Sequence, residues 1–168
     1  MIRLLLAATA ALAICGPAAA ADAAKVKRGE YLVTIMACSD CHTPGVFLGK
    51  PDFSKTLAGS DVGFAIPGLG YFWAPNLTPD DETGLGKWSE DDIVKTLRTG
   101  TRPDGRQLIP SMPWMAYGVL TDDDAYAIAA YLKSLAPISN EAEVAPVGWG
   151  ETPKAPYQTV VMPETAAK

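Results

Sequence analysis

Apolar side chains recur at helical spacing in three stretches of the chain, and the first runs from Lys25 to Ala37. Its apolar face carries Val26, Gly29, Val33 and Met36. This spacing predicts an amphipathic helix. Glycine costs about 1 kcal/mol of helix propensity relative to alanine. We therefore interpret Gly29 as a point where another helix approaches closely.

The other two stretches carry signals for the start and end of a helix. From Ser89 to Thr99, the first residue and Asp92 have the spacing of a capping box, and Gly100 follows as a stop. From Thr121 to Leu135, a capping threonine precedes three aspartates, which the positive end of a helix favours. The small residues of this last helix predict a tight crossing with the helix that contains Gly29.

The first 21 residues have the pattern of a cleaved secretory signal peptide. A short start containing Arg3 precedes an apolar run that ends at Cys15, and four alanines follow Gly16-Pro17. The apolar run has about 12 residues, short of the about 20 that span a bilayer. An uncleaved anchor and a lipoprotein with lipidated Cys15 are the alternatives. We expect export to the periplasm.

Composition fits one globular domain after the leader. The chain has 168 residues, of which 48% are hydrophobic, and its net charge is −5. Cleavage after residue 21 removes one charged side chain, Arg3, and makes the net charge −6. The acidic balance argues against a nucleic-acid binder, because such proteins usually carry a basic patch. No nucleic-acid partner is therefore expected.

Residues 38–42 read Cys-Ser-Asp-Cys-His, the C-x-x-C-H signature for attachment of c-type haem. On a helical turn, Cys38 and Cys41 share a face. Both thiols can then form thioethers with the two vinyl groups of one porphyrin. His42 follows directly and can bind the iron from the proximal side. The motif predicts one covalently attached haem c per chain.

Three other interpretations of this motif fit less well. A structural zinc site needs four ligands, and the chain has no second Cys or His pair because His42 is its only histidine. A redox pair of the thioredoxin type requires a βαβ context. A simple disulfide leaves His42 without a role.

The second axial ligand has to be something other than histidine, and methionine is the usual one in cytochromes c. Met112 lies between Pro110 and Pro113, which hold the chain extended. It is the preferred ligand, with Met115 as the fallback. Met36 comes two residues before Cys38, on what we expect to be the same helix, and cannot reach the opposite face. Met162 lies in a proline-rich tail and fits least well.

Two long regions show no helical or strand period. Residues 43–87 are rich in glycine, proline and aromatic side chains, and we expect this segment to wrap the cofactor. Its candidate wall or minor-core residues are Phe47, Phe53, Phe64, Tyr71, Phe72 and Trp73. Residues 137–168 carry five prolines. They are predicted to form an extended or partly disordered surface tail.

The order of these elements and motifs resembles a class I cytochrome c. More closely, the chain is similar to the monohaem units in cytochrome subunits of bacterial membrane-bound alcohol, aldehyde and gluconate dehydrogenases. The stretches that carry the resemblance are CSDCHTPG at 38–45, APNLTPDDETGLGKWSEDDI at 74–93 and RTGTRPDGRQLIPSMPWMAYGVLTDDDAYAIAAYLKSL at 98–135. The dehydrogenase subunits of this group often carry three such units, whereas this chain has one.

The resemblance implies an all-α fold of helices and long loops around one covalent haem. The cytochrome c domain is placed at residues 22–136. The resemblance also implies axial ligation by His42 and Met112. In class I cytochromes a Pro-x-Leu carbonyl accepts the second ring N–H of the haem-binding histidine, and Pro75-Asn76-Leu77 looks similar. Pro51 or a glycine carbonyl are the alternatives.

The roles of the residues around the cofactor are less defined. Trp88 is either a donor to a haem propionate or a core residue. Arg98, Arg102 and Arg106 are either propionate partners or solvated surface charges.

Together these features predict a carrier of single electrons, not an enzyme with a substrate of its own. The expected partners are a dehydrogenase donor and an oxidase or cytochrome acceptor in the respiratory chain. Contact with the membrane is expected only peripherally, through those partners. The competing interpretation is a haem enzyme, or a sensor of peroxide or gas, with an open distal iron site. No distal acid–base group supports it.

Overall fold

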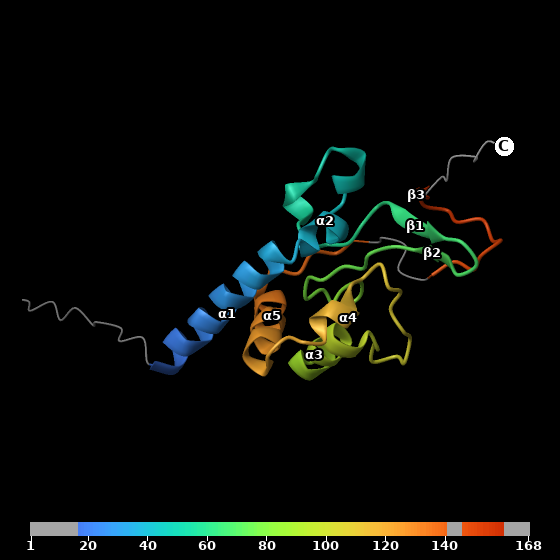
Figure 1. Ribbon diagram of the computed structural model, residues 1–168. Coiled ribbons are helices and arrows are strands. Elements are labelled where there is room, and N and C mark those ends of the chain that lie inside the picture. The colour runs from blue at the N-terminus through green and yellow to red at the C-terminus, as the bar shows by residue number, and fades with distance from the viewer. Residues whose placement is uncertain (1–16, 141–145, 160–168) are drawn as a thin grey trace, which may run out of the picture.

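The computed structural model describes residues 17–140 and 146–159 (Figure 1). Its helices are α1 (Pro17–Ile35), α2 (Cys38–His42), α3 (Glu90–Thr99), α4 (Trp114–Tyr117) and α5 (Asp122–Ser134). Two 3-10 turns, η1 (Val46–Leu48) and η2 (Phe53–Lys55), follow α2. The strands are β1 (Gly63–Ile66), β2 (Gly70–Phe72) and β3 (Tyr157–Gln158). The predicted all-α fold holds for the body of the molecule, and the small sheet is an addition to it.

Helices α1 and α5 cross in close contact, as the sequence predicts (Figure 1). A Cβ atom on Gly29 would lie 1.9 Å from the carbonyl oxygen of Ala127 and 2.7 Å from Cβ of Tyr131. Only glycine therefore fits at this crossing. The core around it is apolar and consists of Leu32, Val33, Leu57, Leu85, Ile93, Val94, Leu97, Ala125, Ala127, Ile128, Ala129 and Leu132.

The predicted helix caps are present. The Ser89 side chain accepts a hydrogen bond from the Asp92 amide, and the Asp92 carboxylate accepts one from the Ser89 amide. Gly100 ends α3 with a φ of 69°. Thr121 caps α5 by accepting a bond from the Asp124 amide.

A three-stranded sheet lies at the opposite end of the molecule from the start of α1, and the sequence did not predict it (Figure 1). Strands β1 and β2 are antiparallel, while β3 pairs with β1 in parallel. Val147 forms an additional bridge with Tyr71. Strands of two to four residues are too short to show an alternating pattern, and β3 is far from β1 in the sequence.

Three further details differ from expectation. Helix α1 begins at Pro17, so it includes residues 17–21 that the sequence assigns to the leader. It ends at Ile35, so Met36 lies in the turn before α2 and not on a helix shared with Cys38. Phe53 is 77% exposed and takes no part in a core. No helix among residues 17–140 and 146–159 is long and apolar enough to cross a membrane.

Candidate haem site

Helix α2 places the two thiols one helical turn apart. Ala37 adopts a left-handed conformation, with a φ of 55°, and turns the chain between α1 and α2. Cys38 and Cys41 are half-buried and form no disulfide. Burial raises the pKa of Cys38 to about 11 and also raises the pKa of Cys41. Reactive cysteines of redox enzymes, by contrast, have lowered pKa values.

His42 is buried, and its Nδ1 atom lies 2.7 Å from the carbonyl oxygen of Pro75. A carbonyl oxygen can only accept, so Nδ1 carries the proton. Burial lowers the pKa of His42, although the bond to Pro75 opposes this effect. The imidazole is therefore neutral at pH 7 and keeps a lone pair on Nε2, as a metal-binding histidine requires.

Helix α4, which follows Met112 in the chain, lies near the two thiols. The pKa of Tyr117 in α4 is raised, first by burial and then by the nearby Cys38 and Cys41. Met112 is half-buried and packs against the hydrophobic core. Met115 is 60% exposed. Met36 packs against the core, whereas Met162 lies outside the described residues.

Trp88, Arg98 and Arg102 have partners within the protein, and Arg106 lies near Arg102. Trp88 is half-buried against the core, and the guanidinium of Arg102 lies 5.0 Å from its ring centroid. Arg98 donates to the Leu120 carbonyl and pairs with Asp122. The pKa of Arg106 is lowered by burial and by the neighbouring Arg102. No contact here decides whether Trp88 or an arginine binds a propionate, so those roles stay predictions.

The donor set suits a covalent haem better than a free metal ion. Two unpaired thiols one turn apart, a neutral buried histidine and a half-buried thioether are the groups that c-type haem requires. The indole Nε1 of Trp114 is buried without a hydrogen-bond partner among the described residues, so a donor is available near the Met112 loop. Within the same residues, no three Cys, His, Asp or Glu side chains cluster as metal ligands.

The sequence pattern of the cytochrome c family matches residues 26–136. The chain belongs to the cytochrome c family. Membership implies a covalently bound haem c, and the helices around α2 have the class I cytochrome c arrangement that the sequence predicts.

Several relatives of this cytochrome are subunits of dehydrogenases. It is 35% identical, over 88% of its length, to the gluconate 2-dehydrogenase cytochrome c subunit of Pantoea cypripedii, covering 32% of that protein. The alcohol dehydrogenase (quinone) cytochrome c subunit of Gluconobacter oxydans is 34% identical over 77% of this chain and 25% of its own. The fructose dehydrogenase cytochrome subunit of Gluconobacter japonicus is 37% identical over 68% of this chain and 22% of its own length. The cytochrome thus spans about a third or less of these relatives.

Sequence reasoning missed the polar residues near Pro75, whose carbonyl bonds His42. Asn76 and Thr78 are almost completely buried and hydrogen-bond to each other and to Ile138. Asn140 donates to the carbonyl of Ala58. The local sequence Asn76-Leu77-Thr78 does not reveal that Asn76 bonds a residue more than 50 positions away along the chain.

Proposed function

We propose that this protein is a periplasmic monohaem cytochrome that carries single electrons between a dehydrogenase and the respiratory chain. Cys38 and Cys41 hold the haem, and His42 and Met112 are its axial ligands. The observation that carries the proposal is the geometry at His42. A neutral, buried imidazole donates Nδ1–H to the Pro75 carbonyl and follows directly on two free thiols.

Each side chain of the site has a defined task in this proposal. When bound, the haem supplies a one-electron iron couple. The Nδ1–H bond to Pro75 fixes the orientation of the His42 ring, so that the Nε2 lone pair is free to bind the iron. Met112 contributes a thioether, which raises the reduction potential relative to harder ligands. His42 and Met112 would together hold the iron and leave no room for a substrate on it, which favours electron transfer over ligand chemistry.

Docking of a redox partner is supported by the exposed apolar side chains next to the Met112 loop. Met115 is 60% exposed and Val119 is 87% exposed. Small apolar surfaces of this kind suit transient electron-transfer contacts. The chain is acidic overall, so a partner with a basic patch gains from electrostatic steering. The names of the relatives point to a dehydrogenase as the donor.

Export and haem loading are tested together by absorption spectroscopy. The full chain, with its leader, is produced in a bacterium with the c-type haem maturation system, and the periplasmic fraction is collected. We expect a low-spin c-type spectrum, one haem per chain, and the weak far-red band of methionine-ligated ferric haem. A high-spin spectrum without that band contradicts Met112 ligation and supports the enzyme or sensor with an open iron site. A colourless protein contradicts the whole proposal.

Electron transfer itself is tested by mixing the oxidised protein with membranes that contain a quinone-dependent alcohol dehydrogenase and its substrate. We expect reduction that slows as the salt concentration rises, because screening weakens steering. Turnover of hydrogen peroxide without reduction by the membranes would favour an enzyme instead.

A further inference from the structure

The residue that follows Pro75 is the centre of a buried hydrogen-bond network. Asn76 is 1% exposed. Its Nδ2 donates to Thr83 Oγ1 at 2.9 Å and to the Ile138 carbonyl at 2.7 Å. Its Oδ1 accepts from the amide and the hydroxyl of Thr78, both at 2.8 Å. All of the hydrogen-bonding capacity of the Asn76 amide is therefore used, which fixes the peptide next to the carbonyl that holds His42.

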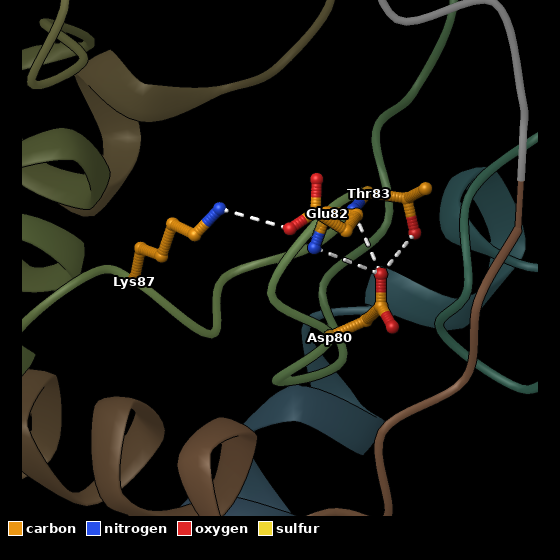
Figure 2. A network of polar contacts seen from close by, with 4 residues as sticks. All are labelled: Asp80, Glu82, Thr83 and Lys87. Carbon is orange, nitrogen blue, oxygen red and sulfur yellow. Dashed lines mark hydrogen bonds and ion pairs between the residues drawn. The ribbon is translucent and has the colours of Figure 1, made fainter.

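The loop beyond Asn76 completes this network, and Figure 2 shows the contacts among Asp80, Glu82, Thr83 and Lys87 of this loop. Thr83 donates its hydroxyl to Asp80 Oδ1 at 2.7 Å, and its amide donates to the same oxygen. The Thr83 hydroxyl oxygen accepts from Asn76 Nδ2 and from the Asn140 amide. Glu82 and Lys87 form an exposed ion pair at the rim of this loop.

Residues 138–140 enter the network from outside the cytochrome c domain, which ends at residue 136. The Ile138 amide donates to Thr78 Oγ1, and its carbonyl accepts from Asn76. Asn140 Nδ2 donates to the carbonyl of Ala58 at 2.7 Å. The next residue, Gly59, donates its amide to the backbone carbonyl of His42 at 2.8 Å. The segment 138–140 is therefore connected to His42 in two ways. One connection runs through Asn76 and Pro75 to the ring, and the other runs through Ala58 and Gly59 to the backbone.

We propose that Asn76 is a positioning residue. Its hydrogen bonds link the peptide next to Pro75 to residues 138–140, and so set the strength of the hydrogen bond between the Pro75 carbonyl and His42. The inference rests on the proposed function, in which His42 ligates the haem iron. A firm bond from Nδ1–H makes the imidazole a more basic ligand, which favours the oxidised iron. Loosening the network is expected to weaken the bond and raise the reduction potential.

Thr78 offers a matched pair of variants for the test, made in the full-length haem-loaded protein. Thr78→Val keeps the shape of the side chain but removes the hydroxyl that links Asn76 to Ile138. Thr78→Ser keeps the hydroxyl. Ser60→Ala serves as a control for general destabilisation, because Ser60 is fully buried and its hydroxyl, within the described part of the chain, bonds only Val62. Thr83→Val is the second variant if Thr78→Val does not fold, because it removes the hydroxyl that accepts from Asn76 Nδ2.

Two readouts separate positioning from a merely structural role. The first is the redox equilibrium with a dye of known potential, where a tenfold shift corresponds to about 59 mV for one electron. The second is the hydrogen–deuterium exchange rate of His42 Nδ1–H, measured by NMR. We expect Thr78→Val to shift the equilibrium three- to tenfold toward the reduced form and to speed exchange at least tenfold. Thr83→Val should act in the same direction, and Thr78→Ser and Ser60→Ala should stay near the unmodified protein.

The inference is overturned if Thr78→Val and Thr83→Val change both readouts no more than Ser60→Ala does. If the unmodified protein carries low-spin haem in that case, the proposed function stands and only the role of Asn76 fails. If the unmodified protein binds no haem through Cys38 and Cys41, the proposed function fails, and this inference fails with it.

Discussion

The α1–α5 pair and the segment between His42 and Trp88 are stabilised in different ways. The helices meet through glycine, alanine and aliphatic side chains, and their contact is dense and apolar. The segment has little regular structure and is held by side chains that bond to distant backbone groups. The first region creates a rigid frame, and the second uses directional bonds to place the Pro75 carbonyl against His42.

The helix crossing is expected to give the largest loss when it is disturbed. Gly29→Ala places a methyl group 1.9 Å from the Ala127 carbonyl, so the helices have to separate. The gain in helix propensity offsets part of this, and we expect a net loss of about 3 kcal/mol of unfolding free energy. Denaturant unfolding of the haem-loaded protein measures it. Ala24→Leu, at an exposed position of α1, is the control. An equal loss in both variants would contradict the close crossing.

A single lysine connects the two regions and should give the second largest effect. Lys133 Nζ in α5 donates to the carbonyl oxygens of Leu85, Gly86 and Trp88, at distances of 3.1, 2.8 and 2.9 Å. Lys133→Met keeps the apolar stem but removes these bonds, and we expect a loss of about 2 kcal/mol. Urea denaturation compares it with Lys95→Met, an exposed position of α3. If Lys133→Met left the free energy of unfolding unchanged, the loop would not depend on α5.

The two regions also differ in how far the sequence predicts them. In the α1–α5 pair, the cap of α5 at Thr121 is a local signal, because the interacting groups lie within one helical turn. Gly29 is informative because glycine in a helix needs a reason. The sheet and the Asn76 network depend on contacts between β1 and β3, and between Asn76 and Ile138. Such long-range contacts leave no pattern in either segment. The motif located Cys38, Cys41 and His42, but could not show what surrounds them.

The capping box of α3 is expected to make a pH-dependent contribution to the free energy of unfolding. Ser89→Ala removes the N-cap of α3 and is expected to cost about 1 kcal/mol at pH 7. Hydrogen bonds from the Ser89 side chain and backbone lower the pKa of Asp92. The stabilisation by this carboxylate is present above its unfolded pKa and is lost as the pH falls through its lower folded pKa. The difference between Ser89→Ala and the unmodified protein should therefore shrink in acid.

Thermal unfolding between pH 3 and 7 measures this trend, with Ser134→Ala as the control. Ser134 donates to the Tyr131 carbonyl at the end of α5 and has no titratable partner in that bond. Its effect should not vary with pH. If the stability loss caused by Ser89→Ala grew as the pH fell, the predicted direction of the pH dependence would be wrong.

The smallest effect is expected at the rim of the loop. Glu82 and Lys87 pair at 3.1 Å, but their side chains are 81% and 67% exposed (Figure 2). Exposed ion pairs contribute little, so Glu82→Gln should change stability by less than about 0.5 kcal/mol. The same unfolding assay, repeated at high salt, measures this. A loss as large as that of Lys133→Met would mean that charge, and not buried hydrogen bonding, holds the loop.

The most direct test of the central claim compares the reduction potentials of Met112→Leu, Met115→Leu and the unmodified protein in one spectroelectrochemical titration. Met112 is half-buried beside the core, whereas Met115 is largely exposed. The account predicts that Met112→Leu loses the far-red band and has a lower potential, because a thioether ligand raises the potential of haem iron. Met115→Leu should match the unmodified protein. An unchanged band and potential in Met112→Leu would contradict the proposed electron-transfer site.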